Sequence, residues 1–496
     1  MIAARTMAPW LAALALATTP TSANTSAGTS TSTSTSTSNG LTTPAGTPNA
    51  LLMLPADACD QDCLACPGLA DPEHYAEGSM KALRMITPGQ ERWLFRSETD
   101  LATDFGFPDA RAETWFRQLV STLSRQGTAL VMILQPTRGL MHQDRLLAND
   151  RASFDAERAR QGMARFQTQL RRAGAIVPDM LPLVDQPPEA DYFFRRDHHW
   201  TPAGARATAE RVGEALADHP LRRRLPPQAF VTEPGAVIRK RGSLNSGLGQ
   251  ICGNHYGHQY LRTYQTRPAQ QQNQAALFGD PPRPEAVLVG TSNSAARDDD
   301  QKNYNFDGFL KQALATDVLN HALPGAGAAG ALQQFLHSAD YDPTQPPAAI
   351  LWELPLNYRL DDPLMYRQLL PAVSGRCRGD RQIRRQTLPL PALQVHQRYE
   401  VLSNTGDQYL DLRGLDGYLD LRFSDPDLKA FYIITYYDNG ERDKVWIRRP
   451  AAVAGGQYYL ALSRSPRLAG ANLLSVFIEP TQTTAAASEM EIRLCR

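Results

Sequence analysis

The sequence predicts an α/β domain with a mostly parallel sheet flanked by helices, followed by an all-β sandwich domain. Two patterns predict this order. From about residue 85 to residue 360, helical patterns alternate with unbroken apolar runs, and such runs are typical of parallel strands covered on both faces. After Cys377 the chain carries short strand-like runs separated by turn signals such as Asp438-Asn439-Gly440, as in a β-sandwich.

The helices of the α/β part are marked by helical spacing and by end signals. Gly127 follows the first helix where a helix usually stops, and Ser153 is expected to cap the second. Thr201 and Pro202 form a good N-cap and first-turn pair for the third helix. The expected helices cover residues 112–123, 153–173, 203–217, 309–314 and 328–336.

Short apolar runs are expected to be the strands, and functional residues should gather at the carboxyl ends of the parallel ones. The expected parallel strands cover 129–134, 175–177, 286–289 and 348–354. The expected strands of the sandwich cover 409–412, 418–423, 431–437, 444–448, 458–462 and 474–478. Residues 220–283 show no clear periodicity, and we expect an insertion that forms one wall of the cleft.

The N-terminus has the pattern of a secretory signal peptide. Arg5 supplies a positive charge, residues 7–17 form a short apolar core, and Thr21-Ser22-Ala23 is a plausible cleavage site. An uncleaved anchor is the alternative. No later stretch approaches the roughly 20 uninterrupted apolar residues of a membrane span. The expected segments are a signal peptide (1–23), a Ser/Thr-rich disordered leader (24–54), the α/β domain (55–370) and the sandwich (371–496).

Charge and cysteine content narrow the class of protein. Lysine plus arginine equals aspartate plus glutamate, at 51 each, so the net charge gives no indication of nucleic-acid binding. Export and an even cysteine count favour disulfides in an oxidising compartment. Cys377 and Cys495 bracket the last domain as a disulfide closing it would. A structural zinc at Cys59, Cys63 and Cys66 is the alternative, and Cys252 with nearby histidines would have to complete it.

Two short motifs carry the candidate chemistry. Asp197 and His199 are two positions apart, so an extended segment would place them on one face and His198 on the other. Ser292 follows the end of the strand expected at 286–289. A serine nucleophile, a histidine base and an aspartate that orients the base are the parts of an acyl-transfer site.

Simpler readings of both motifs remain open. Gly290-Thr291-Ser292 could be a plain turn, and His199 or Trp200 could merely pack at a helix entry. His198 and His199 could bind a metal, but no third ligand is suitably spaced. The sequence implies neither a metal nor an organic cofactor. Ser294 stands where a Gly-x-Ser-x-Gly nucleophile elbow has its last glycine, which argues against an ordinary α/β-hydrolase.

Beyond these motifs, the chain resembles the AlgX/AlgJ family of alginate O-acetyltransferases, which have an SGNH-hydrolase-like domain. The likeness covers roughly residues 55–496, and it includes a C-terminal carbohydrate-binding module. The Asp and His precede the Ser, unlike in ordinary SGNH hydrolases. The other matching segments are Trp93-Leu94-Phe95-Arg96 with Asp100-Leu101, Pro136-Thr137-Arg138, Asn305-Phe306 with Leu310-Lys311-Gln312-Ala313-Leu314, and Trp352-Glu353-Leu354-Pro355.

The resemblance implies roles for matching positions. Ser292 would take the acetyl group, His199 would act as base and then acid, and Asp197 would hold the imidazole. Tyr358 falls where the family has a tyrosine near the oxyanion site, although it could be a packing residue. The implied disulfides are Cys66–Cys252 and Cys377–Cys495, with Cys59 and Cys63 left to bond to each other.

The second domain has a sugar-binding signal of its own. Lys444, Trp446 and Arg448 alternate, so they share one face of a strand. An exposed aromatic ring beside cations suits an acidic sugar. Thr435 and Tyr437 are expected to extend that surface from the neighbouring strand. The alternative places Trp446 in the sandwich core.

Together, motifs and resemblance predict a periplasmic O-acetyltransferase that acts on mannuronate residues of alginate, with an unidentified acetyl donor. The expected partners are the anionic polysaccharide and proteins of an exopolysaccharide secretion complex, without nucleic acid. An esterase or deacetylase with the same triad is one alternative. A non-catalytic, polysaccharide-binding component of a secretion complex is the other.

Overall fold

A parallel four-stranded sheet forms the centre of the first domain. The computed structural model describes residues 65–270, 283–375, 377–449 and 455–496. The sheet has the order β3-β8-β6-β7, and every neighbouring pair is parallel. Its strands are β3 (Ala129–Gln135), β6 (Ala286–Val289), β7 (Val318–Asn320) and β8 (Ala349–Pro355). β3, β6 and β8 are almost fully buried, as expected where helices cover a parallel sheet. In the short edge strand β7 only Val318 is buried.

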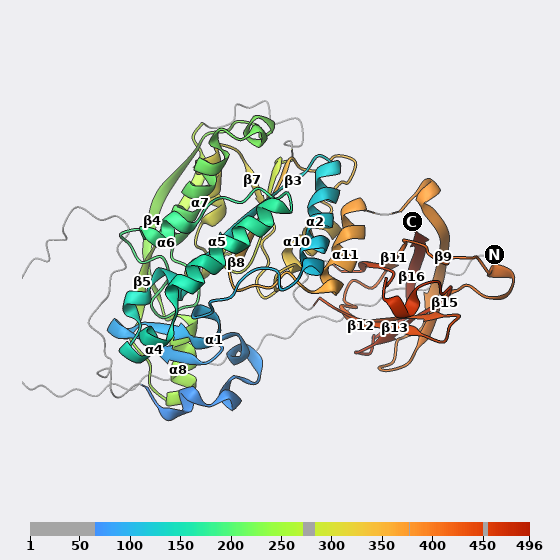
Figure 1. Ribbon diagram of the computed structural model, residues 1–496, viewed down its shortest axis with the longest axis horizontal. Coiled ribbons are helices and arrows are strands. Elements are labelled where there is room, and N and C mark those ends of the chain that lie inside the picture. Colours follow the sequence, from blue (N-terminus) through green and yellow to red (C-terminus); the bar gives the residue numbers. More distant parts are fainter. Residues whose placement is uncertain (1–64, 271–282, 376, 450–454) are drawn as a thin grey trace, which may run out of the picture. The chain divides into compact units, whose positions relative to one another are not determined.

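Helices precede and follow these strands along the chain, so the domain is α/β as predicted (Figure 1). α2 packs on β3 and on α11, whereas α7 packs on α9. The longer helices are α2 (Ala110–Arg125), α5 (Ala156–Arg172), α7 (Pro202–Ala217), α8 (Ser243–Cys252), α9 (Phe306–Leu314), α10 (Gly330–His337) and α11 (Pro363–Ser374). The shorter ones are α1 (Ser97–Asp100), α3 (Arg138–Met141), α4 (Ala148–Ser153) and α6 (Leu181–Asp185).

Two of the predicted local features differ from the structure. Ser153 ends α4 and does not cap α5; the cap is Asp155, whose carboxylate accepts a hydrogen bond from the backbone N of Arg158 at 2.9 Å. The segment expected as a strand over 175–177 makes only one isolated bridge, between Ile176 and Val131. By contrast, Thr201 does cap α7, with its Oγ1 accepting from Gly204 N at 3.1 Å.

The expected insertion is not irregular. Within its described residues, β4 (Phe230–Lys240) and β5 (Gln259–Pro268) form an antiparallel ribbon, and α8 lies between them in the chain. A β-bulge between Pro234 and Val237 interrupts the alternation, and most side chains of β4 are at least partly exposed. An exposed ribbon has no continuous apolar face, so periodicity could not reveal it. A second small sheet pairs β1 (Ile86–Pro88) with β2 (Leu94–Arg96).

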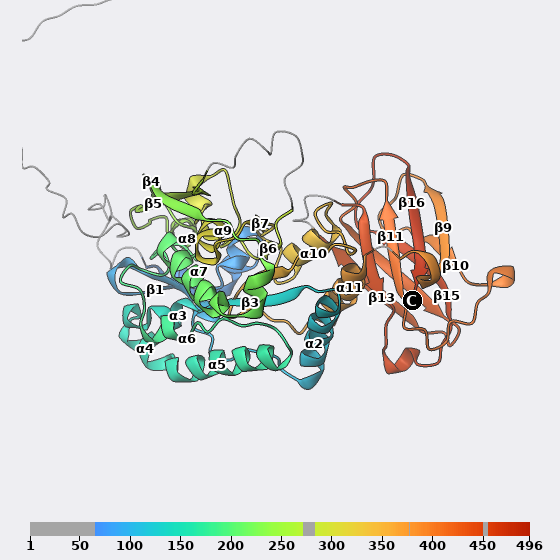
Figure 2. The same ribbon diagram turned by 90° about the horizontal axis from the view of Figure 1, so that it is seen from above.

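The C-terminal residues form two antiparallel four-stranded sheets, which confirms the all-β prediction (Figure 2). Apolar side chains from both sheets share one core, including those of Leu419, Leu421, Phe431 and Ile433. One sheet has β10 (Tyr399–Ser403), β15 (Leu473–Pro480), β12 (Ala430–Tyr437) and β13 (Arg442–Arg448). The other has β14 (Gln457–Ala461), β11 (Tyr418–Phe423), β16 (Ser488–Cys495) and β9 (Gln382–Leu390). The run 409–412 is not a strand, and β9, β10 and β16 were not expected.

Within the described residues there are two disulfides, and both are the expected ones. Cys66 bonds to Cys252, and Cys377 bonds to Cys495, which closes the C-terminal module. The expected signal peptide, the leader, Cys59 and Cys63 lie outside the described residues. In the part of the chain that the structure describes, no helix is long and apolar enough to cross a membrane.

Candidate active site

The aspartate and the histidines lie in a tight loop directly before α7. The carboxylate Oδ1 of Asp197 accepts a hydrogen bond from the backbone N of His199 at 3.0 Å, which is the local turn that aspartate favours. The expectation of an extended segment with His198 on the opposite face is therefore wrong. The two imidazole centroids are only 3.8 Å apart, and His198 Nδ1 lies 2.6 Å from Ser243 Oγ.

Two hydrogen bonds connect the three predicted catalytic side chains. His199 Nδ1 lies 2.5 Å from Asp197 Oδ1, and His199 Nε2 lies 2.8 Å from Ser292 Oγ. A carboxylate can only accept, so Nδ1 donates to Asp197 and Nε2 is left to accept the serine proton. Sequence and structure thus bring Asp197, His199 and Ser292 into the order that a nucleophilic serine requires.

The loop after β6 holds Ser292 through a buried glutamate. Glu353 of β8 accepts hydrogen bonds from Thr291 N at 2.8 Å and from Ser294 Oγ at 2.9 Å. A Cβ on Gly290 would lie 2.7 Å from Glu353 Oε2, so glycine lets the strand end approach this carboxyl group. Burial raises the pKa of Glu353, although the hydrogen bonds from Thr291 and Ser294 oppose that rise. Ser294 therefore has a structural task that the glycine of a nucleophile elbow could not perform.

Trp200 joins the two motifs. Its indole Nε1 donates to the backbone O of Asn293 at 2.9 Å, and its backbone N donates to Asn293 Oδ1 at 3.3 Å. The ring is fully buried, so the packing role considered for Trp200 is real. These contacts also fix the distance between the histidine loop and the serine loop.

A buried arginine supports the histidine loop from below. Arg138 donates to the backbone O of Phe194 at 2.7 Å and to the backbone O of Asp197 at 2.9 Å. It also pairs with Asp100 at 3.2 Å. Burial lowers the pKa of Arg138 to about 10, while Asp100 opposes that shift. The sequence singled out Arg138 only through the resemblance and assigned it no role.

The charges around the triad favour an ionised aspartate and a neutral histidine. Burial opposes ionisation of Asp197, but Lys240 and His199 together hold the pKa of Asp197 well below its ordinary value. Burial lowers the pKa of His199, and Asp197 only partly offsets this. Burial and the neighbouring His199 lower the pKa of His198 well below its ordinary value. A neutral His199 next to Ser292 is a competent general base.

The insertion supplies two residues that sequence reasoning missed. Lys240 Nζ lies 3.2 Å from Asp197 Oδ2, and Ser243 N donates to the same oxygen at 2.9 Å. Lys240 is the last residue of β4 and Ser243 is the first residue of α8, so the positions of these two elements bring both residues to Asp197. A single lysine and a single serine in a segment without periodicity carry no signal that could have identified them.

Tyr358 lies three residues after the end of β8 and is partly buried. Burial raises the pKa of its hydroxyl, and Glu353 adds to the rise. Among the described residues, no hydrogen bond joins Tyr358 to Ser292 or His199. Its assignment to the oxyanion or substrate site stays a prediction.

The acidic, histidine and cysteine side chains of the described residues offer few places where a metal ion could bind. Two groups of three bring their donor atoms within 4.8 Å: Asp197 with His198 and His199, and Asp420 with Cys377 and Cys495. In the first, the ammonium of Lys240 already neutralises Asp197, and in the second both sulfurs form a disulfide. Neither group suits a cation, and the expected absence of a metal stays a prediction.

The predicted sugar-binding strand presents its alternating side chains to solvent. Lys444, Trp446 and Arg448 on β13 are exposed, with the Trp446 side chain 45% exposed, so the alternative that buries Trp446 is wrong. Arg448 lies 5.4 Å from the Trp446 ring centroid. A cationic and aromatic surface of this kind suits an acidic sugar.

The expectation for Thr435 and Tyr437 is wrong. Both side chains are buried, at 2% and 6% exposure, because odd-numbered positions of β12 in this register face the core. Tyr432 takes their place, since it is the direct partner of Trp446 and stacks on it at 6.2 Å between centroids. The ammonium of Lys444 lies 4.1 Å from the Tyr432 ring.

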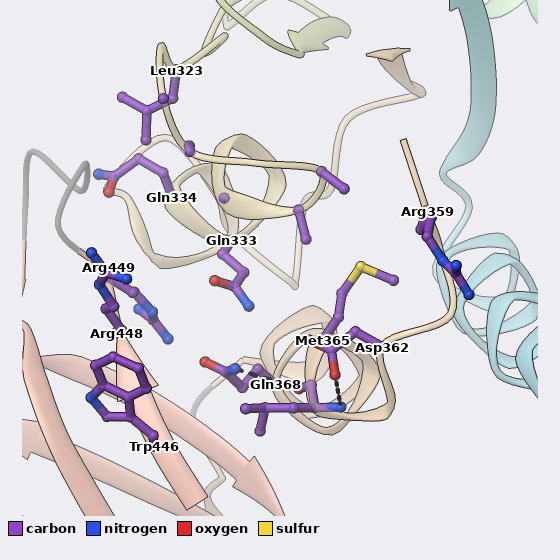
Figure 3. Close-up of a pocket in the computed structure, with 16 residues that line it drawn as sticks. Leu323, Gln333, Gln334, Arg359, Asp362, Met365, Gln368, Trp446, Arg448 and Arg449 are labelled. Carbon is purple, nitrogen blue, oxygen red and sulfur yellow. Dashed lines mark hydrogen bonds between the residues drawn. The ribbon is translucent and has the colours of Figure 1, made fainter. Parts of the chain in front are cut away.

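A pocket of about 350 Å³ lies beside this strand (Figure 3). Trp446, Arg448 and Arg449 line one side of it. The other sides carry Gln333 of α10 and Met365 of α11 (Figure 3). α11 is anchored nearby, because Arg367 pairs with Asp443 at 2.7 Å and donates to Ala461 O at 2.9 Å. The sugar-binding candidates therefore open onto a pocket rather than a flat sheet.

Comparison with known proteins places both parts of the chain. Residues 86–356 match the family described as "SGNH hydrolase-like domain, acetyltransferase AlgX", and residues 377–496 match a C-terminal carbohydrate-binding module. The alginate biosynthesis protein AlgX of Pseudomonas aeruginosa is 33% identical, over 87% of this chain and 88% of that protein. The probable alginate O-acetylase AlgJ of Pseudomonas putida is 32% identical over 55% of this chain and 70% of that protein.

A solved structure agrees with these matches. The structure of Pseudomonas aeruginosa AlgX is similar with a TM-score of 0.77 and 32% identity, over 87% of this chain and 98% of that one. The α/β part with its parallel sheet is thus SGNH-like, and the sandwich is a carbohydrate-binding module. The chain belongs to the AlgX family.

Proposed function

We propose that this protein is a periplasmic O-acetyltransferase that transfers acetyl groups, through an acetylated Ser292, to hydroxyls of mannuronate residues in alginate. The observation that carries the proposal is the hydrogen-bonded series Asp197–His199–Ser292 in a chain with an acetyltransferase-like domain. The names of its relatives, alginate biosynthesis protein and probable alginate O-acetylase, supply the substrate class.

In the first half-reaction, Ser292 Oγ attacks the carbonyl carbon of the acetyl donor while His199 Nε2 takes the hydroxyl proton. The resulting imidazolium is stabilised by Asp197, which keeps the ring in the tautomer that presents Nε2 to the serine. The tetrahedral intermediate then collapses. The donor's leaving group departs with the proton from His199, and an acetyl ester remains on Ser292.

In the second half-reaction, a sugar hydroxyl attacks the acetyl carbon and His199 Nε2 takes its proton. The bond between Ser292 Oγ and the acetyl carbon breaks, and the serine recovers its proton from His199. Transfer prevails over hydrolysis when the bound polymer fills the space that water would otherwise occupy.

The C-terminal module supplies that polymer. Arg448 can grip a uronate carboxylate, while the Trp446 ring can stack on a pyranose. Lys444 adds a cation, although Glu479 already pairs with it at 2.7 Å. Holding the polymer by the module raises the concentration of acceptor hydroxyls near Ser292.

Mass spectrometry tests the proposal on wild type and Ser292→Ala, each incubated with an activated acetyl ester and short mannuronate oligomers. We expect wild type to acetylate the sugar and Ser292→Ala to fail. Ser121→Ala, a change at an exposed position of α2, is the matched control and should retain activity.

Each other outcome of this experiment selects a different function. Release of acetate alone by wild type, with no acetylated sugar, favours an esterase or deacetylase. Turnover by neither protein, with the oligomer still bound, favours a polysaccharide-binding component. Activity that survives in Ser292→Ala rejects the nucleophile.

A further inference from the structure

Lys240 is a buried cation aimed at the catalytic carboxylate. It is the last residue of β4, and its side chain is only 5% exposed. Its Nζ lies 3.2 Å from the Oδ2 of Asp197, the oxygen that does not face His199. Lysine is seldom buried without a partner, and here the partner is the aspartate of the proposed triad.

The ammonium has no freedom to move elsewhere. It donates to the backbone O of Gln301 at 2.7 Å and to the hydroxyl of Tyr304 at 3.1 Å, in addition to its contact with Asp197. These three contacts use its three N–H bonds. The rings of Phe194 and Tyr304 lie 5.1 and 5.3 Å from Nζ, which adds favourable contacts with the cation.

We infer that Lys240 is a positioning residue of the active site: it neutralises the charge of Asp197, and it thereby keeps His199 a free base under acidic conditions. This inference rests on the proposed function. An aspartate without a cationic partner raises the pKa of a neighbouring imidazole, because the imidazolium and the carboxylate form an ion pair. An aspartate paired with a lysine carries no net charge as a pair, so it raises the pKa of the imidazole less.

Other titratable or charged groups also lie near His199 and act on its pKa. His198 is kept neutral by burial and by the adjacent His199, and Arg297 acts on His199 in the same direction as Lys240. Among the described residues, Lys240 is the cation that contacts the carboxylate of Asp197, whereas Arg138 contacts only its backbone O. The titratable and charged groups around His199 and Lys240 are Asp197, His198, Arg138, Arg297, Asp299 and Tyr304.

The test compares the pH dependence of kcat/KM for acetyl release from an activated ester. Lys240→Met removes the charge and keeps an unbranched side chain. We expect the acidic limb of its profile to shift to higher pH by about one unit, because a unit charge several ångströms away changes the pKa of His199 by about that much in a partly polar interior. Lys240→Arg keeps the charge and should restore much of the wild-type limb. Lys311→Met is the control. It removes a lysine of α9 that pairs with Asp317 at 3.0 Å, and it should leave the acidic limb unchanged.

A purely structural role for Lys240 would lower activity by the same factor at every pH. An acidic limb of Lys240→Met that overlays wild type therefore overturns the inference. If Lys240→Met does not fold, Lys240→Gln, which also removes the charge, is compared with wild type by NMR titration of the His199 ring: a higher pKa of His199 in the variant supports the inference, and an unchanged pKa overturns it. Activity retained by Ser292→Ala would instead reject the proposed function, so the two failures are distinguishable.

Discussion

Single residues define the chemistry of this site. Asp197 Oδ1 meets His199 Nδ1 at 2.5 Å, and Asp197 Oδ2 meets both Ser243 N and Lys240. Both carboxylate oxygens are therefore saturated by donors. An aspartate held in this way cannot rotate, so it fixes the plane of the imidazole and the tautomer that serves Ser292.

Asp197→Asn tests that role. The amide keeps the size of the side chain but can donate to His199 Nδ1. The imidazole would then present the wrong tautomer to Ser292, and Lys240 would face a neutral group in place of the carboxylate. We expect kcat to fall by about 10⁴-fold, while a chromatographic profile and circular dichroism stay close to wild type. Asp185→Asn, at a surface ion pair with Arg160, is the control. A fall of less than tenfold would contradict the assignment of Asp197.

The proximity of the three candidate catalytic residues could be predicted from sequence, because two of them are close in the chain and the third follows a recognisable strand. The support around them could not. Lys240 and Ser243 reach Asp197 across 43 and 46 positions of chain, by way of an exposed ribbon and a helix. Contacts of this kind depend on tertiary packing, which leaves no periodic signal in the sequence.

At the scale of elements, the end of β6 and the end of β8 together position Ser292, the proposed nucleophile. Glu353 receives hydrogen bonds from the serine loop, and Gly290 leaves room for its carboxyl group. The position of Ser292 therefore depends on the register between these two parallel strands, in which Val289 pairs with Trp352.

Gly290→Ala should disturb this aim without changing any catalytic group. The added Cβ would meet Glu353 Oε2 at 2.7 Å and the backbone O of Glu353 at 3.3 Å, so the loop must shift. We expect kcat to fall by roughly 10²-fold, measured by steady-state acetyl transfer. Gly249→Ala is the control, because its closest neighbour is the flexible end of Arg241. Unchanged kcat in Gly290→Ala would show that the loop position matters little.

The exposed face of β13 is the second feature at this scale, because it carries the proposed sugar-binding side chains. Lys444, Trp446 and Arg448 were placed correctly because alternation along one strand is a local property. Thr435 and Tyr437 were misplaced because the face of a neighbouring strand depends on register, and Thr435 pairs with Asp443 rather than with Lys444. A single step in register exchanges the buried and exposed sides of a strand.

Trp446→Ala should weaken binding of mannuronate oligomers by about tenfold, since one ring–sugar contact with adjacent cations contributes on the order of 1–2 kcal/mol. Calorimetry on the full chain measures the affinity. Tyr409→Ala changes another exposed aromatic residue of the module, at 46% exposure, and should leave the affinity unchanged. An unchanged affinity in Trp446→Ala would show that the sugar binds elsewhere.

At the scale of the whole molecule, the described residues belong to one compact unit, Pro48–Arg496. Within it, α11 packs on β14, and Arg367 connects α11 to the module through Asp443 and Ala461. The division into an α/β part and a sandwich was predictable, because each follows from its own pattern of strand length and spacing. The contacts that join them were not, because they involve single side chains far apart in sequence.

Replacing Cys377 and Cys495 by serine should destabilise the module. The disulfide closes a loop of 118 residues, and its loss should lower the free energy of unfolding by roughly 4–5 kcal/mol, measured by urea denaturation. Acetyl release from a small ester should persist at low urea, because the triad lies outside the module. An unchanged denaturation midpoint would contradict this account of the disulfide.

The central claim is that Ser292 carries the acetyl group between donor and polymer. Rapid-quench peptide mapping of wild type with an activated acetyl ester, first without sugar and then after addition of mannuronate oligomers, tests it most directly. We expect an acetyl group on the peptide that contains Ser292, which disappears at a rate that rises with added mannuronate oligomer and which His199→Ala does not form. Acetyl transfer to the sugar with no acetylated Ser292 at any time would contradict the claim.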